Sequence, residues 1–336
     1  MKKISWLEAT SIEEAQRAVN TTVSDALNKN YGKGAIIKSG GIDVLDLMKE
    51  GLIAPDRIIN IRNIPGLDQI QYDAEKGLRI GANVTLAEIE GNKDIGSYYL
   101  ALQQSVAKAA TPQLRNMSTL GGNLAQRTRC WYFRSKEHAC FRKGGAICFA
   151  KNGENEYHAI IDNGTCSSVY ASSVATALLA LDASVEIATM KGERKQVKMG
   201  EFFVPPWVEE GQENILEQGE IITAISIPPL KKGVKSYYIK QGARASYDWA
   251  LADVAVVVEM SGKKCKKAII ALGAAAPIPI RVEDAESILV NEGISEESVL
   301  KAADVAMEKA KPLEKNGYKV AIFKTIIKRA IDKTTS

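Results

Sequence analysis

The chain has 336 residues, of which 46% are hydrophobic and 25% charged, a composition typical of folded globular proteins with room for two or three domains. Its net charge of +4 comes from scattered basic residues, which argues against nucleic acid as a partner, and no apolar run is long enough to span a membrane. The opening residues lack the apolar core of a signal peptide, so we expect a cytoplasmic protein.

The first part of the chain predicts alternating helices and strands. Capping boxes over residues 10–14 precede an amphipathic helix that is predicted to run to Leu27. A short buried strand, a glycine turn and a helix closed by Gly51 follow. Strands over 56–64 and 77–85 then lead into another helix, so the order of elements is α/β.

The middle of the chain continues this order. Residues 97–111 predict a helix that Pro112 ends, and a second glycine turn then runs into a cysteine-rich segment. A helix over 172–181 precedes three strands, the last of which Pro228 ends.

After a linker over 228–235, three predicted strands are followed by three helical stretches. We therefore expect an α+β protein with two domains. The first is a two-lobed α/β domain over 1–228, with lobes of about 1–95 and 96–228. The second is a smaller α+β domain over 233–336, in which helices cover one face of a sheet.

Two glycine turns, "KSGGID" and "STLGGN", suit phosphate binding, because glycine lets backbone N–H groups approach a ligand closely. Neither matches G-x-G-x-x-G or a Walker loop, so a Rossmann or nucleotide-hydrolase interpretation lacks its main support. Each pair alone is better explained as an ordinary turn. Together, two such turns on separate lobes predict a long dinucleotide such as FAD between them.

Four of the five cysteines have the spacing C-x9-C-x7-C-x17-C; they are Cys130, Cys140, Cys148 and Cys166. Cytosolic thiols stay reduced, which argues against disulfides. The spacing has neither the C-x2-C pairs of structural zinc sites nor a ferredoxin pattern. On spacing alone, a [4Fe–4S] cluster, a zinc ion and unliganded core thiols remain equally open.

Neighbouring residues favour iron–sulfur chemistry, because positive charge stabilises an anionic tetrathiolate cluster. The basic residues are Arg127, Arg129, Arg134, Lys136, Arg142 and Lys143. Gly144 and Gly145 let the backbone donate N–H bonds to inorganic sulfur. Of the two histidines, His158 lies in an apolar strand pattern and is expected to be structural, and His138 is a substitute ligand that four cysteines make unnecessary. We expect Cys265 to be a lone strand residue.

From about Ala35 to Leu289 the sequence resembles the FAD-binding medium subunits of molybdenum hydroxylases, the family of xanthine dehydrogenase, carbon monoxide dehydrogenase and aldehyde oxidoreductases. "SGGIDVLDLM" resembles the first FAD turn of the family and "TPQLRNMSTLGGNLA" the second. "GEIITAISIP", "YYIKQGARASYDWALADVAVVVEM" and "IIALGAAAPIPIR" resemble later blocks in the same order.

The chain departs from the family pattern in the first glycine turn, in a later cofactor-binding stretch and in the cysteine loop. Ser39 and Ile42 alter the usual Ala-Gly-Gly-Thr-Asp, and Ala171-Ser172-Ser173 replaces Pro-Ser-Asp, so a hydroxyl stands in place of a carboxylate. Most members have no cysteine loop. The loop here is similar to an insertion that holds an additional [4Fe–4S] cluster in the flavin subunits of 4-hydroxybenzoyl-CoA reductase and of a bacterial aldehyde oxidoreductase.

The resemblance implies two cofactors, FAD and a [4Fe–4S] cluster. The implied FAD-binding residues are Ile37, Lys38, Ser39, Gly40, Gly41, Ile42, Asp43, Val44, Ala109, Thr119, Leu120, Gly121, Gly122, Asn123, Ser173, Ile222 and Lys240. The implied cluster ligands are Cys130, Cys140, Cys148 and Cys166, in a loop over 127–166.

The resemblance also implies an oxidoreductase component that passes electrons between partner subunits and an external acceptor or donor, with no catalytic acid, base or nucleophile of its own. A large molybdopterin-binding subunit and a small [2Fe–2S] subunit are the implied partners, in a dimer of heterotrimers. Two alternatives stand beside it. One is a self-sufficient flavin-dependent oxidoreductase, which needs a substrate base that a chain with two histidines lacks; the other is a zinc-stabilised binding module without redox activity.

Overall fold

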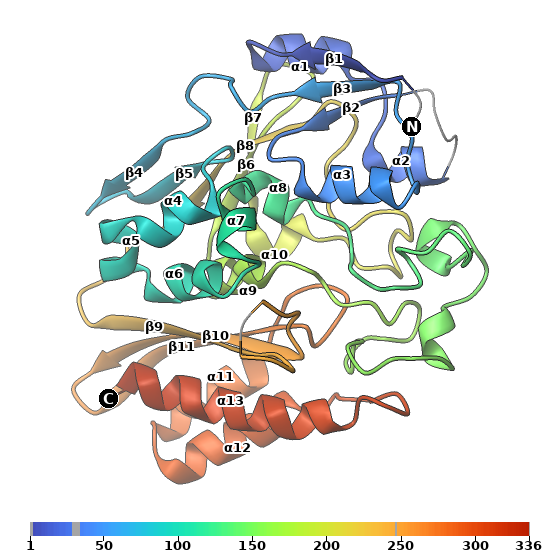
Figure 1. Ribbon diagram of the computed structural model, residues 1–336. Coiled ribbons are helices and arrows are strands. Elements are labelled where there is room, and N and C mark those ends of the chain that lie inside the picture. Colours follow the sequence, from blue (N-terminus) through green and yellow to red (C-terminus); the bar gives the residue numbers. More distant parts are fainter. Residues whose placement is uncertain (1–2, 29–33, 246, 336) are drawn as a thin grey trace.

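The computed structural model describes residues 3–28, 34–245 and 247–335, and Figure 1 shows how they are arranged. Within these residues the strands form three sheets. A small sheet lies at the top of Figure 1, a larger one in the middle, and the C-terminal sheet with its helices at the bottom. The cysteine segment, drawn in green, lies at the right-hand side. No helix among the described residues is both long and apolar enough to cross a membrane.

The small sheet is parallel, in the order β1-β3-β2. Its elements are β1 (Ser5–Glu8), α1 (Ile12–Ala18), α2 (Val23–Asn28), β2 (Ala35–Lys38), α3 (Ile42–Lys49) and β3 (Arg57–Asn60). The helix predicted to run to Leu27 is therefore two helices. The chain leaves α1 because Asn20 pairs with β2: its N–H donates to the Ala35 carbonyl (3.3 Å) and its Oδ1 accepts from the Ala35 N–H (2.7 Å).

The second sheet is antiparallel, in the order β4-β5-β8-β6-β7. Its strands are β4 (Ile70–Asp73), β5 (Gly77–Gly81), β6 (Ser184–Ala188), β7 (Arg194–Lys198) and β8 (Ile221–Ile227). Its helices are α4 (Leu86–Gly91), α5 (Lys93–Tyr98), α6 (Leu100–Ala107), α7 (Pro112–Arg115), α8 (Leu120–Leu124), α9 (Ser173–Ala180) and α10 (Met199–Phe202). The second sheet begins with β4, since β4 and β5 join β8 in the same sheet. The boundary between the two sheets along the chain therefore lies between β3 and β4 and not near residue 95.

The helix predicted over 97–111 is shorter and ends before Pro112. Helix α6 stops at Ala107, and Ala110 takes a left-handed conformation with φ of 46°. Pro112 then opens α7 at its first position, where its missing N–H costs nothing. Proline thus starts a helix here rather than ending one.

The cysteine segment over 127–166 has little regular structure beyond the short 3₁₀ helices η1 (Phe141–Lys143) and η2 (Phe149–Lys151). The strand predicted around His158 does not form; that residue lies in a turn. Ile160 and Ile161 are buried because they pack into the core of the C-terminal domain, where both their N–H groups donate to the Ala275 carbonyl.

The C-terminal sheet is antiparallel, in the order β12-β11-β10-β9. Its elements are β9 (Val234–Gln241), β10 (Ala252–Ser261), β11 (Lys264–Gly273), β12 (Ile280–Arg281), α11 (Glu283–Glu292), α12 (Glu296–Ala306) and α13 (Tyr318–Thr335). These three helices cover one face, as expected (Figure 1). Ala255 and Val257 of β10 point to the other face and pack into the core of the first domain, so the sheet is buried on both sides.

Candidate functional site

The first glycine turn joins β2 to α3 and requires glycine at both positions. A Cβ on Gly40 would lie 2.2 Å from the carbonyl oxygen of Met117, which precedes the second turn. Gly41 has φ of 82°, a left-handed conformation that glycine adopts without cost. As the N-cap of α3, Gly41 has no side chain to satisfy the amides of the first helical turn. Those amides are free to bind an anion.

The second turn differs from the first in its backbone hydrogen bonds. The N–H groups of Leu120 and Gly121 donate to the carbonyls of Val84 and Ala82, and the N–H of Gly122 donates to the Thr119 hydroxyl. These three donors are therefore used within the protein.

Side chains link the two turns directly. The Thr119 hydroxyl donates to Ser39 Oγ (3.0 Å), and the Ser39 hydroxyl donates to Asn83 Oδ1 (2.7 Å). Asn83 Nδ2 in turn donates to the Ile61 carbonyl (2.6 Å). Ser39, a departure from the family pattern, thus joins the two halves of the site. Asn83 was not among the predicted residues.

Both turns line one cleft, which brings together most of the predicted FAD-binding residues. Those that line it are Ile37, Lys38, Ser39, Gly40, Gly41, Ile42, Asp43, Val44, Thr119, Gly121, Gly122, Asn123 and Ile222. Sequence reasoning missed several lining residues, among them Asn83, Gln126 and Arg127. Gln126 and Arg127 follow the second turn closely in sequence, whereas Asn83 is far from both turns and has no such signal.

The remaining predicted residues do not line the cleft. Leu120 is a fully buried core residue, and Ala109 follows α6. Lys240 lies on β9, where its Nζ donates to the Lys108 carbonyl (3.0 Å) and burial lowers its pKa. Ser173 begins α9, but it is the preceding Ser172 whose hydroxyl reaches the cleft, donating to Asn123 Oδ1 (2.5 Å).

The four cysteines of the segment meet around one small pocket, although they are far apart in the sequence. Cys140 and Cys166 are buried, and Cys130 and Cys148 are partly buried. All are free thiols, and Cys265 lies apart from them in β11. Among the described residues, no three or more His, Cys, Asp or Glu side chains are arranged to hold a single metal ion.

Burial favours the protonated thiol at Cys130 and Cys140. It raises the pKa of Cys130 to about 12 and also raises the pKa of Cys140. Cys148 and Cys166 interact with each other, which lowers the pKa of Cys148 and raises that of Cys166. A cation that replaces the protons would therefore gain four thiolates in an enclosed site.

Two basic side chains border the cysteine pocket. Arg142 is 1% exposed; its Nη1 donates to the Gln212 carbonyl (2.5 Å), while its Nε and Nη2 have no partner among the described residues. The contact with Cys148 raises the pKa of Cys166 and burial raises that of Cys140, and the charges of Arg142 and Lys143 offset these increases only in part. The pocket thus presents unused buried donors to an anion.

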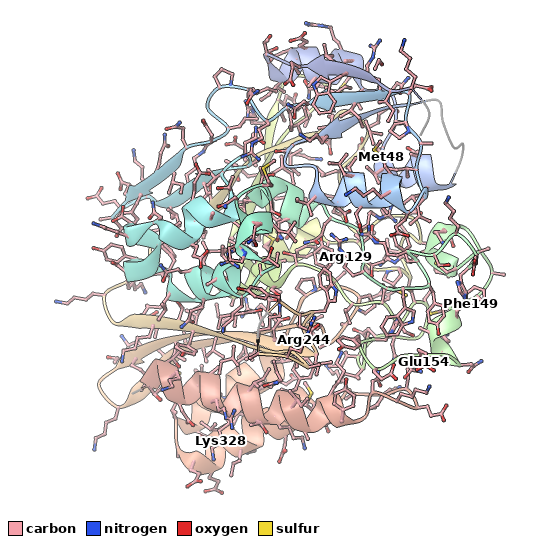
Figure 2. All side chains as sticks on the ribbon, viewed as in Figure 1. Met48, Arg129, Phe149, Glu154, Arg244 and Lys328 are labelled. Atoms are coloured by element: carbon pink, nitrogen blue, oxygen red, sulfur yellow. The ribbon has the colours of Figure 1, made fainter. Side chains whose placement is uncertain are left out.

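All four arginines of the segment have carboxylate partners, including Arg142, whose Nη1 lies 3.9 Å from Glu213 Oε1, and this corrects the expectation that six unpaired cations surround the cysteines. Arg127 pairs with Glu213. Arg129 and Arg134 each pair with both Asp43 and Asp46 of α3, at 2.6 to 3.1 Å. Figure 2 shows Arg129 in the interior, between α3 and the C-terminal sheet. Arg129 and Arg134 thus join the cysteine segment to α3, the helix that follows the first glycine turn.

His158 is the histidine nearest to a cysteine. Its Nε2 lies 3.2 Å from Cys130 Sγ, and burial lowers its pKa to about 4, with help from the charge of Lys319. His138 instead lies with Nδ1 3.0 Å from the Ser135 hydroxyl.

Comparison with known proteins covers the whole chain. Residues 2–230 match the family model described as the FAD binding domain in molybdopterin dehydrogenase, and residues 237–334 match the CO dehydrogenase flavoprotein C-terminal domain. The chain is 33% identical to the aldehyde oxidoreductase FAD-binding subunit PaoB of Escherichia coli, over 91% of this chain and 93% of that protein. It is 25% identical to the carbon monoxide dehydrogenase medium chain of Hydrogenophaga pseudoflava, over 91% of each.

Solved structures share the fold. Carbon monoxide dehydrogenase from Hydrogenophaga pseudoflava superposes with a TM-score of 0.73 at 24% identity, over 98% of this chain and 96% of that one. The enzyme from Oligotropha carboxidovorans gives 0.74 at 22% identity, over 99% and 98%. The chain therefore belongs to the FAD-binding medium subunits of the molybdenum hydroxylase family, as a flavoprotein component of an oxidoreductase complex.

Proposed function

We propose that this chain is an electron-transfer subunit that holds a [4Fe–4S] cluster beside its FAD. The observation that carries the proposal is the meeting of four cysteines around one pocket next to the flavin cleft. Arg129 lines the cleft and immediately precedes Cys130, so the two sites are adjoining parts of one assembly.

The cleft fits a flavin dinucleotide. The space beside Gly40 is too small for a Cβ because the Met117 carbonyl occupies it, so glycine lets the two turns meet at the cleft. The first amides of α3 would hold the pyrophosphate. Thr119 and Asn123 would face it from the opposite wall. Bound FAD supplies the redox chemistry, exchanging electrons with iron–sulfur centres and with an external acceptor or donor. The chain orients the cofactor and sets the charge around it.

The cysteine pocket fits an anionic cluster better than a single ion. Four thiols line a common space, and a [4Fe–4S] cluster takes four thiolate ligands. The unused Nε and Nη2 of Arg142 are buried donors that thiolate or sulfide would satisfy. A [4Fe–4S] cluster bound there would supply a one-electron relay.

The two alternatives have less support. A self-sufficient flavin enzyme needs a substrate base, yet neither histidine of the chain lines the flavin cleft. A zinc module would use the same four cysteines, whose spacing lacks the C-x2-C pairs typical of structural zinc sites.

We propose a large molybdopterin-binding subunit and a small [2Fe–2S] subunit as partners, in a dimer of heterotrimers in the cytoplasm. Relatives named as medium chains or medium subunits support this arrangement, since the name implies larger and smaller companions. The free thiols suit a reducing compartment.

The test is anaerobic purification of the chain with its co-expressed partners, followed by iron, sulfide, zinc and flavin analysis of the isolated subunit. We expect four irons per flavin, and Cys140→Ser should lose most of that iron while it keeps the flavin. Cys265→Ser is the control, because Cys265 lies in β11 away from the pocket, and it should keep both. Zinc in place of iron, or iron content unchanged in Cys140→Ser, would reject the cluster.

A further inference from the structure

Cys130 differs from the other cysteines of the pocket in having a histidine against its sulfur. His158 is 2% exposed, and its Nε2 lies 3.2 Å from Cys130 Sγ, within range of a hydrogen bond to sulfur. The other ring nitrogen, Nδ1, is buried and has no hydrogen-bond partner in the described part of the chain. Among the described residues, the sulfur is thus the hydrogen-bond partner of this ring.

The direction of this hydrogen bond follows from the chemistry of the sulfur. A cysteine that ligates iron has lost its proton and only accepts hydrogen bonds. The proton between the two atoms must then belong to His158 Nε2. This holds for a neutral ring with its proton on Nε2 and for a charged ring, so a Cys130 thiolate makes Nε2 the donor.

The C-terminal domain holds His158 in place. Its backbone carbonyl accepts from Lys319 Nζ (2.8 Å) and Asn316 Nδ2 (3.1 Å), both fully buried. Lys319 Nζ also donates to the Ala274 carbonyl (2.6 Å), which joins the turn to the end of β11. The ring packs edge-on against Trp131, with centroids 5.0 Å apart. These hydrogen bonds fix the backbone of His158, and Trp131 packs against the ring that faces the sulfur.

We infer that His158 is a positioning residue whose Nε2–H donates to the Cys130 thiolate and raises the reduction potential of the cluster. The inference rests on the proposed function. A hydrogen bond to a ligand sulfur stabilises the more negative, reduced state more than the oxidised one, and such bonds are among the controls that proteins exert on cluster potentials.

His138 provides a matched comparison. It belongs to the same segment and also packs among aromatic rings, with its centroid 4.9 Å from Phe149 and 5.1 Å from Tyr132. Its Nδ1, however, lies beside the Ser135 hydroxyl rather than a sulfur. Replacing His138 by phenylalanine therefore changes the aromatic packing without removing a donor to the cluster.

The experiment is a redox titration of the cluster in the intact complex, followed by electron paramagnetic resonance of the reduced state. His158→Phe keeps an aromatic ring but removes the donor, and we expect a lower midpoint potential, with about tenfold less reduced cluster at a given potential, or about 59 mV for one electron. His158→Gln, which can donate an N–H, should recover part of the shift. His138→Phe should titrate like the wild type. A midpoint of His158→Phe equal to that of the wild type would overturn the inference.

A second measurement does not depend on a variant that folds. In wild-type complex with ¹⁵N-labelled histidine, the reduced cluster should show a hyperfine coupling to one histidine nitrogen, and this coupling should persist in His138→Phe. An iron–sulfur signal without that coupling would contradict the role of His158 alone. If the wild-type subunit gave no reduced iron–sulfur signal at all, the proposed function itself would fail.

Discussion

Asp43 Oδ1 lies 2.9 Å from Arg129 Nη2, which joins the first turn of α3 to the residue before Cys130. The same carboxylate pairs with Arg134 (2.6 Å) and accepts the Arg127 N–H (2.9 Å) through its other oxygen. Asp43 and Arg129 both line the flavin cleft. One carboxylate therefore holds the flavin turn and the start of the cysteine segment in a common arrangement.

Removing this charge should destabilise the protein. Asp43→Asn leaves Arg129 and Arg134 largely buried with one carboxylate fewer, and we expect a loss of about 3 kcal/mol in the free energy of unfolding, measured in urea. Glu292→Gln is the control, because its ion pair with Lys301 is exposed and should change stability by less than about 0.5 kcal/mol. Equal effects of the two substitutions would show that the Asp43 network is not a structural link.

The first glycine turn gives a prediction for flavin content. Gly40→Ala places a Cβ 2.2 Å from the Met117 carbonyl, so the two turns must move apart, at a cost of about 1–3 kcal/mol. We expect the purified variant to carry much less flavin per chain, measured by visible absorbance. Gly91 is exposed at the end of α4, and a Cβ added there would have no neighbouring atom within 4 Å. Gly91→Ala should therefore retain full flavin content. Normal flavin content in Gly40→Ala would mean that the turns do not approach as closely as described.

Asp253 on β10 should make stability depend on pH. It is 2% exposed, and burial raises its pKa from 3.8 to about 6, although Lys240, Lys319 and the hydroxyls of Thr176 and Tyr238 favour the charged form. Because the pKa of Asp253 is higher in the folded than in the unfolded state, protonated Asp253 stabilises the fold. This stabilisation is complete below the unfolded-state pKa and is lost as the pH rises through about 6. Near neutral pH the charged form therefore costs about 3 kcal/mol.

Asp253→Asn removes this titration. As the pH rises from about 4 to about 7, the free energy of unfolding of Asp253→Asn, measured in urea, should increase by about 3 kcal/mol relative to that of the wild type. Asp284→Asn, at an exposed position on α11, should follow the wild-type curve. Parallel curves for wild type and Asp253→Asn would contradict the prediction.

The contact between the C-terminal domain and the cysteine segment should be measurable by hydrogen exchange. Asn316 is fully buried, and its Nδ2 donates to the carbonyls of His158 (3.1 Å) and Ala159 (3.3 Å). Asn316→Ala removes one donor from each carbonyl, although Lys319 and Asn163 still donate to them. The loss should cost about 1 kcal/mol, so amides over 154–161 should exchange faster. Asn291→Ala, at an exposed position of α11, should leave their exchange unchanged. Unchanged exchange in Asn316→Ala would show that other contacts hold the segment.

Most regular elements follow local patterns, and sequence reasoning found them. The strand and helix around the first glycine turn, the strands of the C-terminal sheet and its helices occur where periodicity and turn residues predict them. The errors occur where a distant partner competes with a local preference. Asn20 leaves a helical pattern to pair with Ala35, and Ile160 packs into the C-terminal core instead of extending a strand.

The sequence by itself determined which residue types the site contains: two glycine pairs at turns, and four cysteines whose clustering signals a shared role. Backbone conformation and residue chemistry are local properties, so they can be read one segment at a time. Only the tertiary structure decided that the first turn keeps its amides free while the second has used them, and that His158 lies against Cys130. Hydrogen bonds of this kind join residues far apart in the chain, and packing of the three sheets determines which of them can form.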